Sequence, residues 1–406
     1  MHQTPLLVTT AQELSTALAA PSVQHLQVQG HLRGLMGFRL RPGQTLSGDP
    51  SAVLEFASGQ DGVQLSADNQ IEGLVLKTDV DRLAIHTDAT QPTWGTLALR
   101  ELQVQGVVQL VARGNIRSGH VQVEGLHISA ADARALEDHP IGYGVEVLQG
   151  AFTLWNQQAE TTVHITADLM DLSAGLPGAP VRGSGIFVSG AGDVGGRLVV
   201  SRLQTGPVYS DGGIRAGTPD RITGAVFTVY GAYVDQVRNT GPVVTYGAND
   251  MVLDNWGTVD EWVAEQKISS YGPSGIGFVN FGVTRTLQVL APIETFGQGA
   301  RAFNVYAGTV ERAEFERLVT HADGAVGLQI SQPVGHIHIR RGIETFGAEG
   351  DSLVKGVVMR LSAIGLSIKP GGSARSISVQ GGVTCHQPGV QALDLQGPVA
   401  SLRIES

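Results

Sequence analysis

The C-terminal half of the chain repeats one pattern of aliphatic, polar and aromatic positions with a period of about 25 residues. Each repeat begins with an aliphatic residue, has Thr or Ser at its third position and an aromatic residue or His at its fourth, and ends in Gly or Ala. The aligned segments are 243–247, 268–272, 293–297, 318–322 and 343–347, and the pentapeptide IETFG forms the third and the fifth. A fixed period of this length predicts stacked supersecondary units.

Glycines mark a second corner in each repeat, at Gly257, Gly282 and, after a one-residue insertion, Gly308. The runs between corners are short and rich in Val, Ile and Thr, which is typical of strands. Two or three such strands in each repeat predict a coil of a parallel β-helix, in which each strand pairs with its counterpart one coil further on. Leucine-rich repeats have a similar period, but their leucine and asparagine consensus is absent.

The repeat extends upstream with looser spacing. The sequence TGPV occurs at 205–208 and again at 240–243, so this coil has about ten extra residues and places Asp211 in the aromatic column. Similar alternating runs broken by glycine occur at 61–78, 100–116, 143–157 and 184–203. Because no linker or shift in composition interrupts them, we expect one solenoid over 23–406, with inserted loops near 130–143, 172–185 and 206–240.

Residues 1–22 are expected to form an N-terminal cap. Thr10 and Glu13 fit a capping box in front of the amphipathic sequence QELSTALAA. A short helix of this kind would cover the exposed first coil of a solenoid. This helix, followed by the strand sequence HLQVQGHLRG, resembles the entry of right-handed parallel β-helix proteins of the pectate lyase and pectinase class. We therefore predict an all-β fold, a single right-handed parallel β-helix with coils of about 25 residues and a short N-terminal capping helix.

Composition and charge narrow the functional classes. The 54 glycines and an aromatic content of 5% fit many short strands and tight turns. With 27 basic and 37 acidic residues the formal charge is −10, which opposes general binding to nucleic acid or to anionic membranes. The single cysteine, Cys385, excludes an internal disulfide. We see neither a signal peptide nor an apolar run long enough to span a bilayer, so we expect a cytoplasmic protein.

The outward-facing columns of the repeat contain candidate binding and catalytic residues. Side chains alternate along a strand, so an inward first column implies an inward third column, with the second and fourth facing outward. An exposed aromatic stripe would indicate a binding surface for sugar rings or for a partner subunit. Alternatively, the rings fold inward at the corner before each glycine. The fourth column consists of Asp211, Tyr246, Tyr271, Phe296, His321 and Phe346.

Glu294 and Glu344 occupy the second column two coils apart, about 9 to 10 Å along the axis. Paired carboxylates near this spacing suit an inverting glycosidase, although exposed glutamates are also common as simple surface charges. The stretch 206–282 is the densest in aromatic, acidic and amide residues. Within it Asn255, like Asn280 one coil on, precedes a corner glycine and fits a structural asparagine ladder.

We therefore predict a carbohydrate-active enzyme, either a glycoside hydrolase or an intramolecular glycosyl or fructosyltransferase, that acts on an oligo- or polysaccharide. The catalytic candidates are Asp211, Asp250, Asp254, Glu294 and Glu344. The substrate-binding candidates are Tyr209, Arg215, Tyr246, Asn249, Trp256, Tyr271, Phe296, His321 and Phe346.

No cofactor is expected, and no metal, because His336 and His338 lack a third ligand at a defined spacing. The alternative is a non-enzymatic structural or glycan-binding β-helix, similar to a tailspike fibre, in which the aromatic column forms a subunit seam. A homotrimer is expected in either case, by analogy with other long β-helices.

Overall fold

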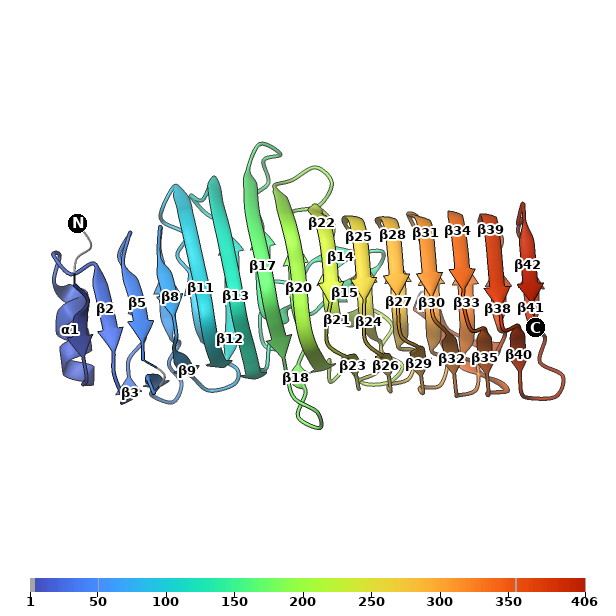
Figure 1. The fold of residues 1–406 in the computed structure, drawn as a ribbon, viewed down its shortest axis with the longest axis horizontal. Coiled ribbons are helices and arrows are strands. Elements are labelled where there is room, and N and C mark those ends of the chain that lie inside the picture. The colour runs from blue at the N-terminus through green and yellow to red at the C-terminus, as the bar shows by residue number, and fades with distance from the viewer. Residues whose placement is uncertain (1–3, 50, 355, 406) are drawn as a thin grey trace.

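The chain winds into an elongated parallel β-solenoid with a helix at its N-terminal end (Figure 1). The computed structural model describes residues 4–49, 51–354 and 356–405. Successive coils place their strands in three rows that run along the solenoid axis. The parallel, nearly all-β architecture confirms the predicted class of fold.

The first row has the longest strands and begins with β1 (Leu6–Val8) beside β2. Its further members are β2 (His25–Val28), β5 (Thr45–Gly48), β8 (Gln70–Glu72), β11 (Thr93–Gln105), β13 (Ser118–Ala130), β17 (His164–Ala174), β20 (Arg197–Asp211), β22 (Ala232–Asn239), β25 (Thr258–Ala264), β28 (Val283–Val289), β31 (Thr309–Phe315), β34 (Pro333–Ile339), β39 (Ser373–Gln380) and β42 (Leu402–Glu405).

The second row follows the first around a corner, and β11, β13, β17 and β20 are long enough to continue into it. Its separate strands are β3 (His31–Leu35), β6 (Val53–Phe56), β9 (Val75–Lys77), β18 (Val181–Arg182), β23 (Val243–Thr245), β26 (Ile268–Ser270), β29 (Ile293–Thr295), β32 (Leu318–Thr320), β35 (Ile343–Thr345) and β40 (Val383–Cys385).

The third row forms a separate parallel sheet. Its strands are β4 (Phe38–Arg39), β7 (Val63–Leu65), β10 (Leu83–Thr87), β12 (Val107–Ala112), β16 (Gly150–Asn156), β19 (Ser184–Ser189), β21 (Arg221–Thr228), β24 (Asp250–Asn255), β27 (Ile276–Asn280), β30 (Arg301–Val305), β33 (Val326–Ile330), β38 (Leu366–Ile368) and β41 (Leu393–Leu395).

The five aligned repeats pair in the register that their sequences predict. Ile268 lies beside Ile293, which lies beside Leu318, so each step along the second row is one sequence repeat. The first-column residues are buried in the core, and the third-column Thr and Ser side chains are fully buried beside them. Asn255 donates to Asn280 Oδ1 at 3.3 Å, which confirms the buried asparagine ladder.

At the N-terminal end, α1 (Ala11–Ala19) packs Leu14 and Ala17 onto the first coils. Thr10 Oγ1 accepts from the Glu13 amide at 3.2 Å, while the Glu13 carboxylate accepts from Thr9 instead of Thr10. The range 1–22 expected for the cap includes residues 1–3, which lie outside the described residues.

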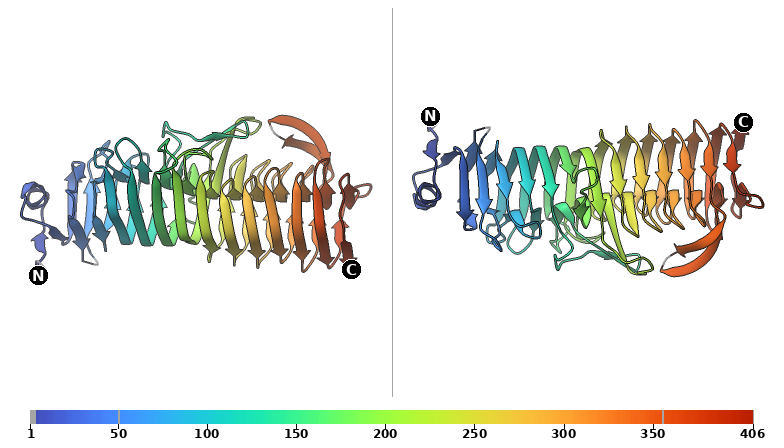
Figure 2. Two further views of the ribbon diagram at one scale, coloured as in Figure 1. Left: turned by 90° about the horizontal axis from the view of Figure 1, so that it is seen from above. Right: turned by 90° about the horizontal axis from the view of Figure 1, so that it is seen from below.

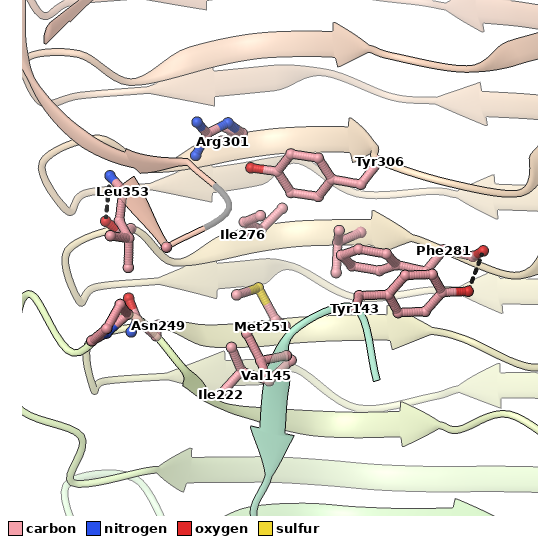
Figure 3. A pocket seen from close by; sticks show the side chains of 14 residues that line it. Tyr143, Val145, Ile222, Asn249, Met251, Ile276, Phe281, Arg301, Tyr306 and Leu353 are labelled. Carbon is pink, nitrogen blue, oxygen red and sulfur yellow. Dashed lines mark hydrogen bonds between the residues drawn. The ribbon is translucent and has the colours of Figure 1, made fainter. Parts of the chain in front are cut away.

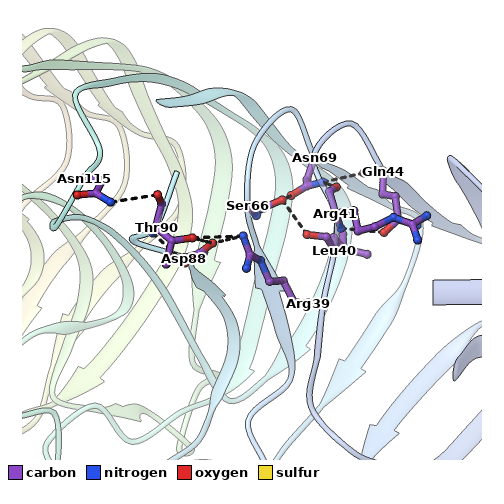
Figure 4. A network of polar contacts seen from close by, with 9 residues as sticks. All are labelled: Arg39, Leu40, Arg41, Gln44, Ser66, Asn69, Asp88, Thr90 and Asn115. Atoms are coloured by element: carbon purple, nitrogen blue, oxygen red, sulfur yellow. Dashed lines mark hydrogen bonds and ion pairs between the residues drawn. The ribbon is translucent and has the colours of Figure 1, made fainter. Parts of the chain in front are cut away.

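Polar contacts link successive corners near this end of the solenoid (Figure 4). Arg41 donates to the carbonyl oxygens of Leu18 and Ala20, at 2.8 and 2.7 Å, where the negative end of the helix dipole favours a cation. Asn69 then donates to the Arg41 carbonyl at 2.6 Å, which links the second coil to the third.

Among the residues that the structure describes, two antiparallel strand pairs interrupt the solenoid. The first pairs β14 (Ile141–Gly142) with β15 (Val145–Val147), and the second pairs β36 (Glu349–Val354) with β37 (Val357–Ser362). Both project from the same side of the molecule (Figure 2). The strand β15 also pairs with β21, so the first hairpin lies over the third row.

No helix in the described ranges has the length and apolar character needed to cross a bilayer.

Candidate functional site

The fourth-column residues form an outward-facing stack along the second row. The centroids of Tyr271 and Phe296 are 4.8 Å apart, and those of Phe296 and His321 are 4.5 Å apart, with planes within 8° of parallel. The stack runs through Tyr246, Tyr271, Phe296, His321, Phe346 and His386. Its rings cover one another's faces, so mainly their edges reach solvent. Sugars stack on ring faces, so this arrangement suits a ladder within the fold better than a sugar platform.

The two IETFG glutamates belong to ion pairs with bases on the preceding coil. Lys267 Nζ lies 2.6 Å from Glu294 Oε2. Arg317 pairs with Glu344, which His386 also approaches at 3.3 Å. Partial burial would raise the pKa of Glu344, but hydrogen bonds and charges from Arg317 and His386 outweigh it and lower that pKa. Each glutamate therefore has a local structural partner.

The three aspartate candidates are either paired with a basic residue or buried in the protein. Asp211 pairs with Arg182 and accepts from the Gly213 amide at 2.8 Å. Asp250 is fully buried and accepts from Thr223 Oγ1 at 2.6 Å and from two backbone amides. Burial raises the pKa of Asp250 to about 6, against the opposing effect of these hydrogen bonds.

Asp254 is fully buried, and neither carboxylate oxygen has a hydrogen bond of good geometry among the described residues. Burial raises the pKa of Asp254 well above its ordinary value and outweighs the opposing effect of the Trp256 indole. Neither Asp250 nor Asp254 has a surface that could touch a substrate in this conformation.

The remaining candidates lie in different surroundings. Trp256 is buried in an aromatic cluster beneath the first hairpin, and Asn249 is buried with its amide bonded to the carbonyl of Thr218 at 2.7 Å. Arg215 is exposed on a loop. Tyr209 is half-buried and lines a groove near the second-row end of the long strands. The sequence-derived set is thus dispersed over both sides of the solenoid.

That groove adjoins an unusual column at the corner between the first and second rows. The backbone is left-handed there at Gly73 (φ 65°), Glu101 (50°), Gly125 (70°) and Asp171 (55°). The flanking residues of β11, β13 and β17 pair in register, which stacks Glu101, Gly125 and Asp171 on consecutive coils. Glycine is the residue suited to this conformation, so the two acids carry backbone strain of about 1 kcal/mol or more each.

The two acidic side chains lean the same way along the axis. A Cβ on Gly125 would lie 2.8 Å from Glu101 Oε1, and a Cβ on Gly206 would lie 3.5 Å from Asp171 Oδ1. Their backbone positions are two coils apart, about 9 to 10 Å along the axis. Asp171 Oδ2 also lies 3.8 Å from His127 Nε2. Glu101 has no ion pair within the part of the chain that the structure describes.

The groove beside this column contains about 890 Å³ of space, partly open to solvent. Its walls include Gln103, His127, Ser129, Ser173, Pro207 and Tyr209. The remaining wall is formed by Ile128, Gly175, Leu176 and Pro177, so the polar groups and the Tyr209 ring are set in a mostly apolar surface.

The sequence analysis missed Glu101, His127 and Asp171, although a signal for their corner is present. Along β11, β13 and β17, inward residues normally lie two positions apart, but at one place in each strand they lie three positions apart. This three-residue step falls between Leu99 and Leu102, between Val123 and Leu126, and between Leu169 and Leu172. Three strands with the same irregularity predict an aligned bulge column.

Across 4–49, 51–354 and 356–405, no group of three or more His, Cys, Asp or Glu side chains is arranged to hold a metal ion. The fold defines the protein as a parallel β-helix. Comparisons with protein-family models, with curated proteins and with solved structures found no match, so the chain is assigned to no particular family within that class.

Proposed function

We propose that the protein is a glycoside hydrolase whose site is the corner column of Glu101 and Asp171 with the adjoining groove. The observation that carries the proposal is the pair of acidic residues in left-handed backbone, two coils apart, at a corner where neighbouring coils have glycine. Strain of this kind persists where a side chain must be held in a particular place, and it gathers at functional sites.

The spacing of the pair suggests the mechanism. Carboxyl groups about 6.5 to 9.5 Å apart leave room for a water molecule on the far side of the sugar from the leaving group. One carboxyl group would protonate the glycosidic oxygen while the other activates that water, with inversion at the anomeric carbon. Small side-chain movements bring the two-coil spacing of Glu101 and Asp171 into this range.

The surrounding residues supply binding and orientation. Tyr209 offers a ring outside the mutually stacked ladder, and Gln103 and Ser173 offer hydrogen bonds to hydroxyl groups. His127 lies beside Asp171 and would hold that carboxylate in position.

The test is release of reducing sugar from a panel of fructans, glucans and pectic oligosaccharides. For the best substrate, Glu101→Gln and Asp171→Asn should each lower kcat/KM by about 100-fold or more, since each removes an acid or base function. Glu294→Gln and Glu344→Gln are matched controls that should retain activity. No turnover of any glycan, or equal activity of all four variants, would refute the proposal.

The second candidate function is structural: the face that carries the stacked fourth-column rings would be a contact surface between subunits. The ring edges leave Tyr271 46% and Phe346 37% exposed, an apolar stripe that a subunit seam in a homotrimer would cover. Light scattering should then report three times the mass of 42.6 kDa, and Tyr271→Arg should dissociate the assembly. A wild-type monomer at micromolar concentration contradicts this role.

A further inference from the structure

A second pocket lies on the opposite side of the solenoid, over the third row. It is bounded by the first hairpin and by the hairpin of β36 and β37, and it contains about 610 Å³ of space, part of it open to solvent. Figure 3 shows its main walls, which are Tyr143, Met251, Ile276, Phe281, Arg301 and Tyr306. None of these residues belongs to the proposed glycosidase groove.

Arg301 is the unusual member of this set. It is only 1% exposed, and it stands in register with the apolar residues Ile276 and Val326 on the neighbouring coils. Its guanidinium donates to the carbonyl of Gly299 and to Ser352 Oγ, each at 3.1 Å, while Nε has no partner. Among the described residues, no carboxylate lies within ion-pair distance of Arg301.

A buried cation with only neutral partners is unfavourable, because it has lost its hydration without gaining an opposite charge. Asp254 does not supply that charge, since neither of its carboxylate oxygens has a hydrogen-bond partner among the described residues. The remaining donor capacity of Arg301 therefore suits an anionic group that enters from the pocket.

The other walls define the body of the ligand. The Arg301 guanidinium lies 5.9 Å from the centre of the Tyr306 ring, whose hydroxyl points toward the side of Arg301 (Figure 3). Tyr143 packs its ring 4.6 Å from that of Phe281 and donates to the Phe281 carbonyl at 3.2 Å, which fixes the other wall. Aromatic and aliphatic groups line most of the space between them.

We propose that this pocket binds a small molecule with one carboxylate attached to an aromatic or aliphatic body, with the carboxylate on Arg301 and the body between Tyr143 and Tyr306. The hairpin of β36 and β37 completes the site, since Ser352 comes from it and contacts the same guanidinium. This inference is independent of the glycosidase proposal because the two sites share no residue.

The test compares 3-phenylpropanoate with 3-phenylpropanol, which have the same ring and chain but differ in charge. Titration calorimetry on the full-length wild type should show saturable binding of the carboxylate at least about 10-fold tighter than of the alcohol. Arg301→Met should abolish this preference while the alcohol still binds. Arg312→Met removes an exposed arginine on the first row and serves as the matched control, with binding unchanged.

Arg301→Lys keeps the positive charge and should retain part of the preference for the carboxylate over the alcohol. This second variant keeps the proposal testable if Arg301→Met does not fold. Circular dichroism melting of each variant checks that it is folded. Absence of saturable 3-phenylpropanoate binding to the wild type, equal affinities for the two ligands, or an unchanged preference in folded Arg301→Met would each overturn the proposal.

Discussion

The regular coils from 243 to 347 and the long-strand coils from 93 to 211 each have two acidic residues spaced two coils apart, but in different settings. In the regular coils Glu294 and Glu344 pair with bases one coil back, and the buried Asp250 binds backbone amides at a corner. In the long-strand coils Glu101 and Asp171 occupy strained backbone, and neither pairs with a lysine or an arginine among the described residues.

This difference distinguishes residues that stabilise the coils from residues that we assign to the functional site. A residue that recurs with the period of the coil is explained by its neighbours one coil away, as the stacked rings and the asparagine ladder are. Left-handed non-glycine residues also occur in the regular coils, at Asn249 and Ser274, but the column of Glu101 and Asp171 is the one that places two carboxylates there. The predictions below test whether the two regions respond to substitution as this distinction requires.

The largest expected effect is at Asp171. Asp171→Gly should lower glycan hydrolysis by about 1,000-fold, because the carboxylate is lost. The same substitution should raise the free energy of unfolding by about 1 kcal/mol, because glycine adopts φ 55° without strain. Activity assays and urea unfolding on one preparation measure both. A variant that is both active and less stable would remove the distinction between the two regions.

Buried carboxylates in the regular coils should control the pH dependence of stability. Because the folded-state pKa of Asp250 is raised to about 6 from 3.8, its contribution is complete below about pH 4 and is lost as pH rises toward 6. The loss corresponds to about 3 kcal/mol. Asp254, whose pKa burial also raises well above its ordinary value, should add to this decline.

Urea unfolding of the wild type and of Asp254→Asn across pH 4 to 9 measures the contribution of Asp254 to the pH dependence of stability. The wild type should lose stability relative to the variant as pH rises above about 4, where the unfolded carboxyl ionises and the folded one does not. A difference that is independent of pH would show that Asp254 is already ionised in the folded protein.

Removal of a ladder amide should cost less. Asn255→Ala would delete the amide that donates to Thr284 Oγ1 at 2.8 Å and accepts from the Gly257 amide at 3.0 Å. The buried partners left without hydrogen bonds should lower the free energy of unfolding by about 2 kcal/mol. Glycan hydrolysis should not change in the folded variant, and loss of catalysis at permissive temperature would extend the site into the regular coils.

The smallest effect is expected at the surface ion pairs. A double-mutant cycle with Lys267→Met and Glu294→Gln should give a coupling of about 0.5 kcal/mol that declines in 1 M NaCl. The Arg317 and Glu344 pair should behave similarly. A coupling several times larger would show that these pairs contribute far more than ordinary surface ion pairs.

The sequence repeat allowed the strand register and the inward and outward positions of the regular coils to be predicted. An offset of one repeat brings Ile268, Ile293 and Leu318 side by side, so inward and outward columns follow from alternation alone. The burial of Asp254 does not follow in this way, because the cover over it comes from the hairpin at 141–147, in a distant part of the sequence. The corner column was readable from the three-residue steps, but its left-handed geometry needed the structure.

The most direct test of the central claim, that Glu101 and Asp171 act as a pair two coils apart, is the anomeric configuration of the first product. Proton NMR of early hydrolysis by the wild type should show inversion, because the separation of about 9 to 10 Å leaves room for water. Retention of configuration requires carboxyl groups about 5 Å apart and would contradict the assignment.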